Sequence, residues 1–324
     1  MKIHLVGEAA RQAPLIQAGV PGAEVSALPA DASVDPGHDG AIGPDDVVIT
    51  MRFRRPGGAP QFRLLHAWGA GLDGIDLSCL APGTAVCNVF EHEGPIAEYV
   101  LMNMLCWEIR PETMGFTPEG WGDAFRSRIP HGELGGRTVA IIGFGRIGQA
   151  VAVRARAFGM RVATLDRALK PEARALVDLA VPATDLAALL AAADYVVLAC
   201  PLNDQTRGMI DTSALAAMKP TAVLINVARA AVVDQQALYD ALSSNRIGGA
   251  VLDVWYRTPT GSDDNPLPAD LPLLELPNVV ATAHSAAWTT SLPERRYRFI
   301  AANIARLVAG QPLLNQVWPL AAAR

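Results

Sequence analysis

The sequence predicts an α/β protein in which a doubly wound parallel sheet is joined to a second, smaller α/β unit. Three observations lead to this prediction. Of the 324 residues, 51% are hydrophobic and 18% are charged, a composition that supports a large buried core. From residue 138 onward, apolar runs alternate regularly with helix-like segments, which is typical of βαβ units. Before that point the alternation is uneven, and loops rich in Pro, Gly and Asp interrupt it.

The first part of the chain contains short apolar runs that we expect to form strands of a small open sheet. These runs lie at residues 2–6, 46–50, 62–67 and 85–89. Residues 8–18 predict a short helix between the first two strands. A longer helix is expected at residues 96–109, and a polar, glycine-containing arm follows it at residues 111–130.

The second part of the chain carries the regular pattern. Its expected strands lie at residues 138–142, 161–165, 195–199, 222–227, 250–254 and 279–283. Residues 146–158 place apolar side chains on one helical face, and Gly159 ends that helix. Because these strands show no polar alternation, we expect helices on both faces of their sheet. A further helix is expected at residues 291–309, beyond the last strand, and it can return to the first unit.

Charge and cysteine usage exclude several classes of protein. The formal net charge of −5 gives no electrostatic footprint for nucleic acid or an anionic membrane. No segment is long and apolar enough to span a bilayer, and the apolar start is too short for a signal peptide. The four cysteines form no CxxC pair, and the histidines show no metal-ligand spacing. We therefore expect reduced thiols, a cytoplasmic location and no metal site.

A glycine motif between an expected strand and an expected helix predicts a dinucleotide site. Gly143 allows a tight turn, Gly145 allows a pyrophosphate to approach, and Gly148 allows the helix to pack on the strand. Arg146 and Ile147 complete the loop at the helix N-terminus, whose free N–H groups attract phosphates. The motif alone does not identify a dinucleotide site, because an ordinary glycine-rich turn can also match it.

The end of the next strand strengthens the prediction and indicates the cofactor. Asp166 lies 23 positions after Gly143, where a carboxylate can accept hydrogen bonds from the adenosine ribose. A carboxylate there repels a 2′-phosphate, so NAD is favoured over NADP. Arg167 follows directly and could accommodate such a phosphate, so NADP stays open as the less favoured cofactor.

Polar residues follow three later strands, where ligands bind in open α/β sheets. They are Arg229, Asp253 and His284. Taken singly, an Arg is usually a surface cation, an Asp often caps a helix, and a His is often structural. Their order downstream of a dinucleotide motif favours a catalytic group instead.

At this point the sequence resembles the D-isomer-specific 2-hydroxyacid dehydrogenase family over nearly its whole length. The matching segments are residues 69–76, 96–98, 143–148, 199–202 with Thr206, 226–229, 249–254 and 277–279 leading to His284. The resemblance implies a Rossmann NAD-binding domain inserted in a smaller flavodoxin-like substrate domain. It places the substrate domain at residues 1–98 plus 291–324 and the NAD-binding domain at residues 99–290.

The family resemblance also implies roles for individual residues. Arg229 would bind the substrate carboxylate and polarise the 2-oxo group, and His284 would be the general acid or base. The backbone N–H groups of Ala70 and Gly71 would hold the carboxylate, and Asp253 would contact the nicotinamide carboxamide. Further cofactor contacts are implied for Cys200, Pro201, Thr206, Val227, Ala228, Arg229 and His284.

The implied activity is hydride transfer between NAD(H) and a small D-2-hydroxy acid and its 2-oxo acid, such as glyoxylate or hydroxypyruvate. Such an enzyme acts on a CH–OH group, and NAD or NADP accepts the hydride. The resemblance further implies a homodimer formed through the arm at residues 111–130. An alternative is an NAD(H)-sensing binding protein or corepressor-like module with little turnover, since the family includes corepressors.

One departure from the family pattern concerns the Glu that normally accompanies the catalytic His. Thr258 stands at its place without a gap, and Asn265 does so if an insertion is allowed. Neither is an acid, although Asp263 or Asp264 in the inserted loop could substitute. Without a neighbouring carboxylate, His284 should hold its proton less firmly, so we expect carbonyl reduction to be favoured at acidic pH.

Overall fold

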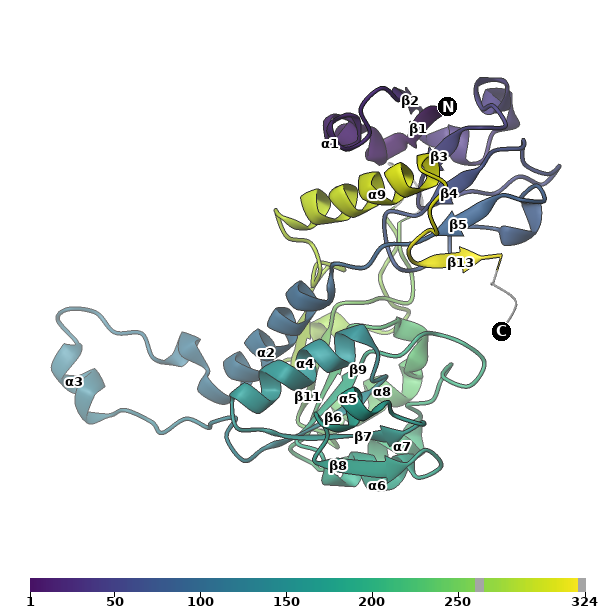
Figure 1. Ribbon diagram of the computed structural model, residues 1–324. Helices are drawn as coiled ribbons and strands as arrows, with labels where there is room; N and C mark the ends of the chain where they lie inside the picture. The colour runs from purple at the N-terminus through teal and green to yellow at the C-terminus, as the bar shows by residue number, and fades with distance from the viewer. Residues whose placement is uncertain (260–264, 320–324) are drawn as a thin grey trace. The chain divides into compact units, whose positions relative to one another are not determined.

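The computed structural model describes residues 1–259 and 265–319, and the chain divides into two compact units (Figure 1). The first unit contains Met1–Glu91 together with Thr289–Arg324, and the second contains His92–Trp288. Residue 98, where we expected the first domain segment to end, lies inside helix α2 (Glu93–Ile109). The helix therefore belongs wholly to the second unit.

The first unit is built on one mixed sheet with the strand order β13-β5-β4-β3-β1-β2. All neighbouring strands in it are parallel except β13, which runs antiparallel to β5. Its strands are β1 (Lys2–Val6), β2 (Glu24–Leu28), β3 (Val47–Ile49), β4 (Leu64–His66), β5 (Ala85–Cys87) and β13 (Gln316–Trp318). Its α-helices are α1 (Ala13–Gly19) and α9 (Leu292–Val308).

Helices α1 and α9 cover one face of this sheet, where Ile16, Ile300 and Ile304 pack against buried strand residues. Loop residues such as Phe53 and Phe62 cover the opposite face. The helix at the end of the chain thus returns to the first unit, as its position beyond the last strand suggested.

The second unit contains a parallel sheet with the order β12-β11-β10-β9-β6-β7-β8. Its strands are β6 (Thr138–Ile142), β7 (Arg161–Asp166), β8 (Leu179–Pro182), β9 (Tyr195–Leu198), β10 (Val223–Asn226), β11 (Gly249–Leu252) and β12 (Val279–Ala281). Its helices besides α2 are α3 (Trp121–Arg126), α4 (Arg146–Ala157), α5 (Pro171–Arg174), α6 (Leu186–Ala192), α7 (Thr212–Ala217) and α8 (Gln235–Ser243).

Both faces of this sheet are buried, which explains why its strands read as continuous apolar runs. Apolar residues of α2 and α4, such as Met104 and Val151, pack on one face. Residues of α6, α7 and α8, such as Leu189, Leu215 and Leu238, pack on the other face. The doubly wound α/β prediction is confirmed. Among the described residues, no helix combines the length and hydrophobicity needed to cross a membrane.

Candidate active site

The glycine loop between β6 and α4 has the geometry of a dinucleotide-binding turn. Gly143 has φ +99°, and a Cβ there would lie 2.4 Å from the backbone nitrogen of Cys200. A Cβ on Gly148 would lie 2.2 Å from the carbonyl oxygen of Gly143, so only glycine lets α4 begin this close to the strand. Gly145, the N-cap of α4, faces open space. The loop therefore has room for a phosphate at the helix N-terminus, and its residues fit a dinucleotide cofactor.

A pocket of about 460 Å³ adjoins this loop. Its lining includes Gly143, Gly145, Arg167, Lys170, Cys200 and Thr206. Asp166 ends β7, is exposed, and is not among the lining residues, whereas the neighbouring Arg167 is. The hydroxyl of Thr206 donates to the carbonyl of Pro201 at 2.7 Å and so fixes the loop that follows β9. Of the residues expected to contact the cofactor, Gly143, Gly145, Arg167, Cys200, Pro201 and Thr206 line this pocket, whereas Arg146, Ile147 and Gly148 of the glycine loop do not.

A second polar group lies at the carboxyl ends of β10, β11 and β12, which are neighbours in the sheet. Arg229 follows β10, Asp253 follows β11 and His284 follows β12. Asn226 shapes the first of these turns: its side chain donates to the carbonyl of Arg229 at 3.1 Å and accepts from the N–H of Ala228 at 3.0 Å. This turn leaves the Arg229 side chain partly exposed.

Asp253 is a buried carboxylate that holds the chain around His284. One of its oxygens accepts from the Thr282 hydroxyl at 2.6 Å and from the Ser285 N–H at 2.7 Å. The other oxygen accepts from the Ala286 N–H at 3.0 Å. His284 itself adopts φ +55°, a left-handed conformation that non-glycine residues rarely take, and its side chain is exposed. Asp253 therefore stabilises a strained turn that presents the imidazole.

Sequence reasoning missed the residues that support Thr282. Its hydroxyl also contacts the Tyr99 hydroxyl at 2.7 Å, and its carbonyl accepts from the Trp255 indole at 2.8 Å. Burial raises the pKa of Tyr99 above its usual value of 10.0. Tyr99 lies 183 positions from Thr282 in the sequence, so no local pattern could have revealed the pair.

The position of the missing Glu is not filled by an acid in the described part of the chain. Thr258 and Asn265 are both exposed. No carboxylate of the described residues lies within ion-pair distance of the His284 imidazole. Asp263 and Asp264 lie outside the described residues.

The loop after β4, in the first unit, contains Ala70 and Gly71, which are both partly exposed. The carbonyl of Ala70 accepts from the Asn88 side chain at 2.9 Å. Their expected role as donors to a carboxylate stays a prediction.

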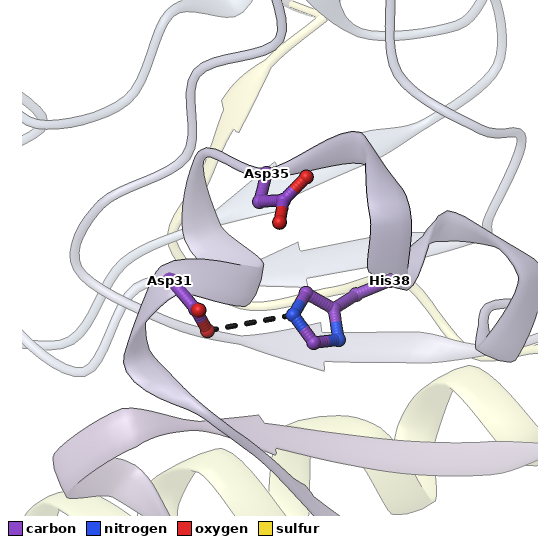
Figure 2. Close-up of side chains that lie close together, drawn as sticks. All are labelled: Asp31, Asp35 and His38. Carbon is purple, nitrogen blue, oxygen red and sulfur yellow. Dashed lines mark ion pairs between the residues drawn. The ribbon is translucent and has the colours of Figure 1, made fainter.

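The first unit also holds one cluster of potential metal ligands among the described residues, made up of Asp31, Asp35 and His38 (Figure 2). His38 lies 3.4 Å from Asp31, and Asp35 accepts from the N–H of Gly37 at 2.8 Å. Both carboxylates are exposed. These contacts account for the cluster as a capped surface turn.

The arm between α2 and β6 carries α3, and Figure 1 shows it extending away from the sheet of its unit. Phe116, Trp121 and Phe125 lie next to one another on it, with ring centroids 4.9 and 5.6 Å apart, yet all three are exposed. Arg128 stacks over the ring of Phe125 at 4.1 Å. The arm thus carries an exposed aromatic cluster that no described residue of its own unit covers.

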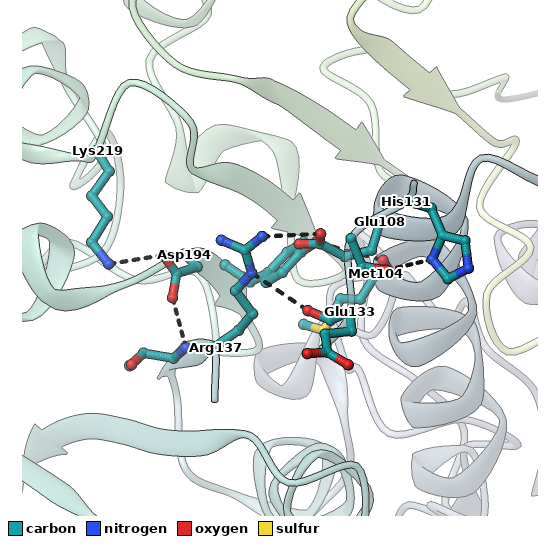
Figure 3. A network of polar contacts seen from close by, with 10 residues as sticks. Met104, Glu108, His131, Glu133, Arg137, Asp194 and Lys219 are labelled. Atoms are coloured by element: carbon teal, nitrogen blue, oxygen red, sulfur yellow. Dashed lines mark hydrogen bonds and ion pairs between the residues drawn. The ribbon is translucent and has the colours of Figure 1, made fainter. Parts of the chain in front are cut away.

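A polar network anchors the base of the arm (Figure 3). Glu108, near the end of α2, accepts from the Tyr195 hydroxyl at 2.7 Å and from Arg137 at 3.2 Å. Burial and the contact with Glu108 raise the pKa of Tyr195. Asp194 pairs with Lys219 at 2.8 Å and accepts from the backbone N–H of Thr138 at 2.8 Å. Burial acts to raise the pKa of Asp194, but these two contacts outweigh it, and the pKa is lowered.

Comparisons with known proteins agree with this fold and site. The family model described as "D-isomer specific 2-hydroxyacid dehydrogenase, NAD binding domain" matches residues 99–286. A glyoxylate reductase of Thermococcus gammatolerans is 35% identical over 279 residues, which cover 82% of this chain and 80% of the relative. A D-3-phosphoglycerate dehydrogenase of Methanocaldococcus jannaschii is 31% identical over 80% of this chain but only 48% of its own length.

Solved structures show the same architecture over 98% of this chain. A D-isomer specific 2-hydroxyacid dehydrogenase family protein of Aeromonas salmonicida superposes with a TM-score of 0.76 at 26% identity, covering 98% of that chain. The NAD-complexed D-isomer specific 2-hydroxyacid dehydrogenase of Lactobacillus delbrueckii gives a TM-score of 0.76 at 26% identity, covering 100% of that chain.

The fold and the glycine loop define a nicotinamide-dependent oxidoreductase of the two-domain kind. The chain belongs to the D-isomer specific 2-hydroxyacid dehydrogenase family. It is an enzyme that transfers a hydride between NAD(H), or NADP(H), and a 2-hydroxy acid and its 2-oxo acid. The family resemblance of the sequence is confirmed, and the enzyme names of the relatives favour catalysis over the alternative of a sensing module.

Proposed function

We propose that this dehydrogenase uses NADH to reduce a small 2-oxo acid, with glyoxylate and hydroxypyruvate as the preferred candidates. The observation that carries the proposal is the placement of Arg229, Asp253 and His284 at the ends of three adjacent parallel strands. The glyoxylate reductases among the relatives support the choice of a small substrate.

The chemistry follows from the side chains. The Arg229 guanidinium, permanently charged and planar, binds the substrate carboxylate and draws electron density from the 2-oxo group. When bound, the nicotinamide cofactor supplies the hydride for C2. The His284 imidazolium donates its proton to the oxygen as negative charge develops there, and solvent returns a proton to the imidazole. Asp253 keeps the turn of His284 in place through its contacts with Thr282, Ser285 and Ala286.

The test is NADH oxidation by the purified protein with a panel of 2-oxo acids. Arg229→Ala and His284→Asn should each lower kcat/KM by about 100-fold or more, the usual contribution of a general acid or charged clamp. Asn is chosen for His284 because it tolerates the left-handed backbone at φ +55°. Matched controls are Arg161→Ala and His131→Asn, both exposed and outside the proposed site. Wild-type rates in the Arg229 and His284 variants would refute the proposal.

We also propose that the chain forms a homodimer in which the arm at residues 111–130 packs on a second copy. The exposed cluster of Phe116, Trp121 and Phe125 supports this, because such apolar groups are usually covered in an assembly. A pocket of about 570 Å³ at the base of the arm provides a receptor for side chains of the second copy. Replacing the three aromatic residues by Ser should convert a dimer to a monomer in light scattering, whereas Val153→Ser, also at an exposed apolar position, should not.

The cytoplasm remains the predicted compartment. Cys79, Cys87, Cys106 and Cys200 are all free, as expected in a reducing environment.

A further inference from the structure

Asn88 is a buried polar residue to which neither the sequence pattern nor the proposed mechanism gives a role. It directly follows β5, is 6% exposed, and its backbone N–H donates to the carbonyl of Asn315 at 3.2 Å. Its side-chain N–H donates to the carbonyl of Ala70 at 2.9 Å. Its side-chain oxygen is buried without a hydrogen-bond partner among the described residues. A buried unpaired oxygen is unfavourable, so a residue retained in this state needs an explanation.

The neighbouring residue makes a parallel contact with the same loop. The N–H of Val89 donates to the carbonyl of Gly69 at 3.2 Å. Two consecutive carbonyls of the loop after β4 are therefore held by two consecutive residues at the end of β5. Gly69 is packed closely, since a Cβ on it would lie 3.0 Å from the Met51 side chain.

The planarity of the trans peptide fixes the direction of the N–H groups of Ala70 and Gly71. Within one peptide unit, the carbonyl of one residue and the N–H of the next point in opposite directions. Because the carbonyls of Gly69 and Ala70 face the end of β5, the N–H groups of Ala70 and Gly71 face away from it. Within the described residues neither N–H donates to a protein acceptor. Consecutive N–H groups of this kind attract anions.

We propose that Asn88 is a positioning residue for the substrate: its side chain turns the Ala70–Gly71 peptide so that two adjacent backbone N–H groups receive the carboxylate of the 2-oxo acid. The inference rests on the proposed function for the identity of the anion. Asn88 does not touch the carboxylate itself in this arrangement. The side-chain amide is needed as the donor, because the nearby backbone N–H groups are already used. The N–H of Asn88 donates to Asn315, and the N–H of Val89 donates to Gly69.

The experiment measures carboxylate binding without turnover. Oxamate, which carries a carboxylate beside an amide carbonyl in place of the ketone, is titrated into the full-length protein saturated with NADH. Asn88→Ala removes the donor, and Asn88→Asp keeps the shape but places an acceptor opposite the Ala70 carbonyl. Both should weaken oxamate binding at least tenfold and leave the Kd for NADH within twofold of wild type.

Thr84→Val is the matched control. Thr84 directly precedes β5, is buried, and its hydroxyl donates to the carbonyl of Phe62 at 2.9 Å. It thus makes the same type of contact at the opposite end of the same pair of strands. The control should bind oxamate as wild type does. In turnover assays the Asn88 variants should raise KM for the 2-oxo acid more than they lower kcat.

Several results would overturn the inference. These are oxamate binding within threefold of wild type in both Asn88 variants, an equal loss in Thr84→Val, or no oxamate binding by the wild-type holoenzyme. A different result would show that the proposed function, and not this inference, is wrong. If the wild type reduces no 2-oxo acid but its oxamate affinity still depends on Asn88, the positioning role stands and the proposed reaction does not.

Discussion

The replacement Asp253→Asn removes a buried charge that three donors share. The carboxylate is 3% exposed and accepts from Thr282, Ser285 and Ala286 at 2.6, 2.7 and 3.0 Å. The Asn side chain has the same shape but offers a single acceptor oxygen, so at least one donor must face the amide N–H₂ group. The bonds that remain also lose the charge-assisted part of their strength.

A hydrogen bond to a charged group contributes about 1.5–3 kcal/mol, and the charge accounts for roughly half of it. One lost bond and two weakened ones therefore predict a loss of about 3–6 kcal/mol in the free energy of unfolding of the second unit. For a unit of this size, the melting temperature falls by about 2–4 °C per kcal/mol, so a decrease of at least about 6 °C is expected. The turn of His284 is held by the same bonds, and its displacement should lower kcat by about 100-fold.

Calorimetric melting and NADH oxidation with the best 2-oxo acid measure the two effects. Asp270→Asn is the control, since Asp270 is exposed and pairs with Arg257 at the surface. A melting temperature within 2 °C of wild type together with a kcat within threefold, in Asp253→Asn, would refute the reasoning that this carboxylate holds the His284 turn.

Further predictions concern the cofactor loop and the acid limb of stability. Gly148→Ala should raise the Kd for NADH more than tenfold in a fluorescence titration, because its Cβ would lie 2.2 Å from the carbonyl oxygen of Gly143; unchanged binding would contradict the packing argument. Arg167→Ala should weaken NADPH binding about tenfold, the effect of one lost charged contact, with NADH within twofold; an equal loss for both would exclude a role at the 2′-phosphate. The Val162 N–H bonded to Asp178 is the main cause of the lowered pKa of that carboxyl, whose usual value is 3.8. Its contribution to stability is present above pH 3.8 and lost as the pH falls through the lowered value, so Asp178→Asn should lower the melting temperature at pH 7 but not at pH 2.

The parts of the fold that could be predicted are those whose strands are buried on both faces. Thr138–Ile142 is buried throughout, so it reads as an unbroken apolar run, and the glycines after it have mechanical roles that the sequence displays directly. Strands β2, β8 and β13 were missed. Each lies at the edge of its sheet and is partly exposed, so it does not form an unbroken apolar run that would distinguish it from a loop.

Some residues of the candidate site could be predicted from the sequence, and others could not. Arg229 and His284 follow apolar strands and stand out in the sequence, whereas the role of Asp253 could not be predicted from local pattern. Its donors lie 29 to 33 positions away, at the end of a neighbouring strand. Asn88 fell inside the expected strand at residues 85–89, and nothing local singled it out, since its role depends on a carbonyl 18 positions earlier.

The division of the first unit into two chain segments has a consequence for how the protein is made. Helix α9 and strand β13 complete its sheet and core, but they are synthesised only after the whole of the second unit. The dinucleotide-binding unit is continuous and can fold during synthesis. The N-terminal strands of the first unit stay uncovered until α9 has been synthesised. During that interval, the face that α9 will cover, which includes Ile3, Leu5 and Ile49, is exposed to chaperones and to aggregation. We therefore expect a chain truncated before α9 to be less soluble than the full chain, because this apolar face would stay uncovered.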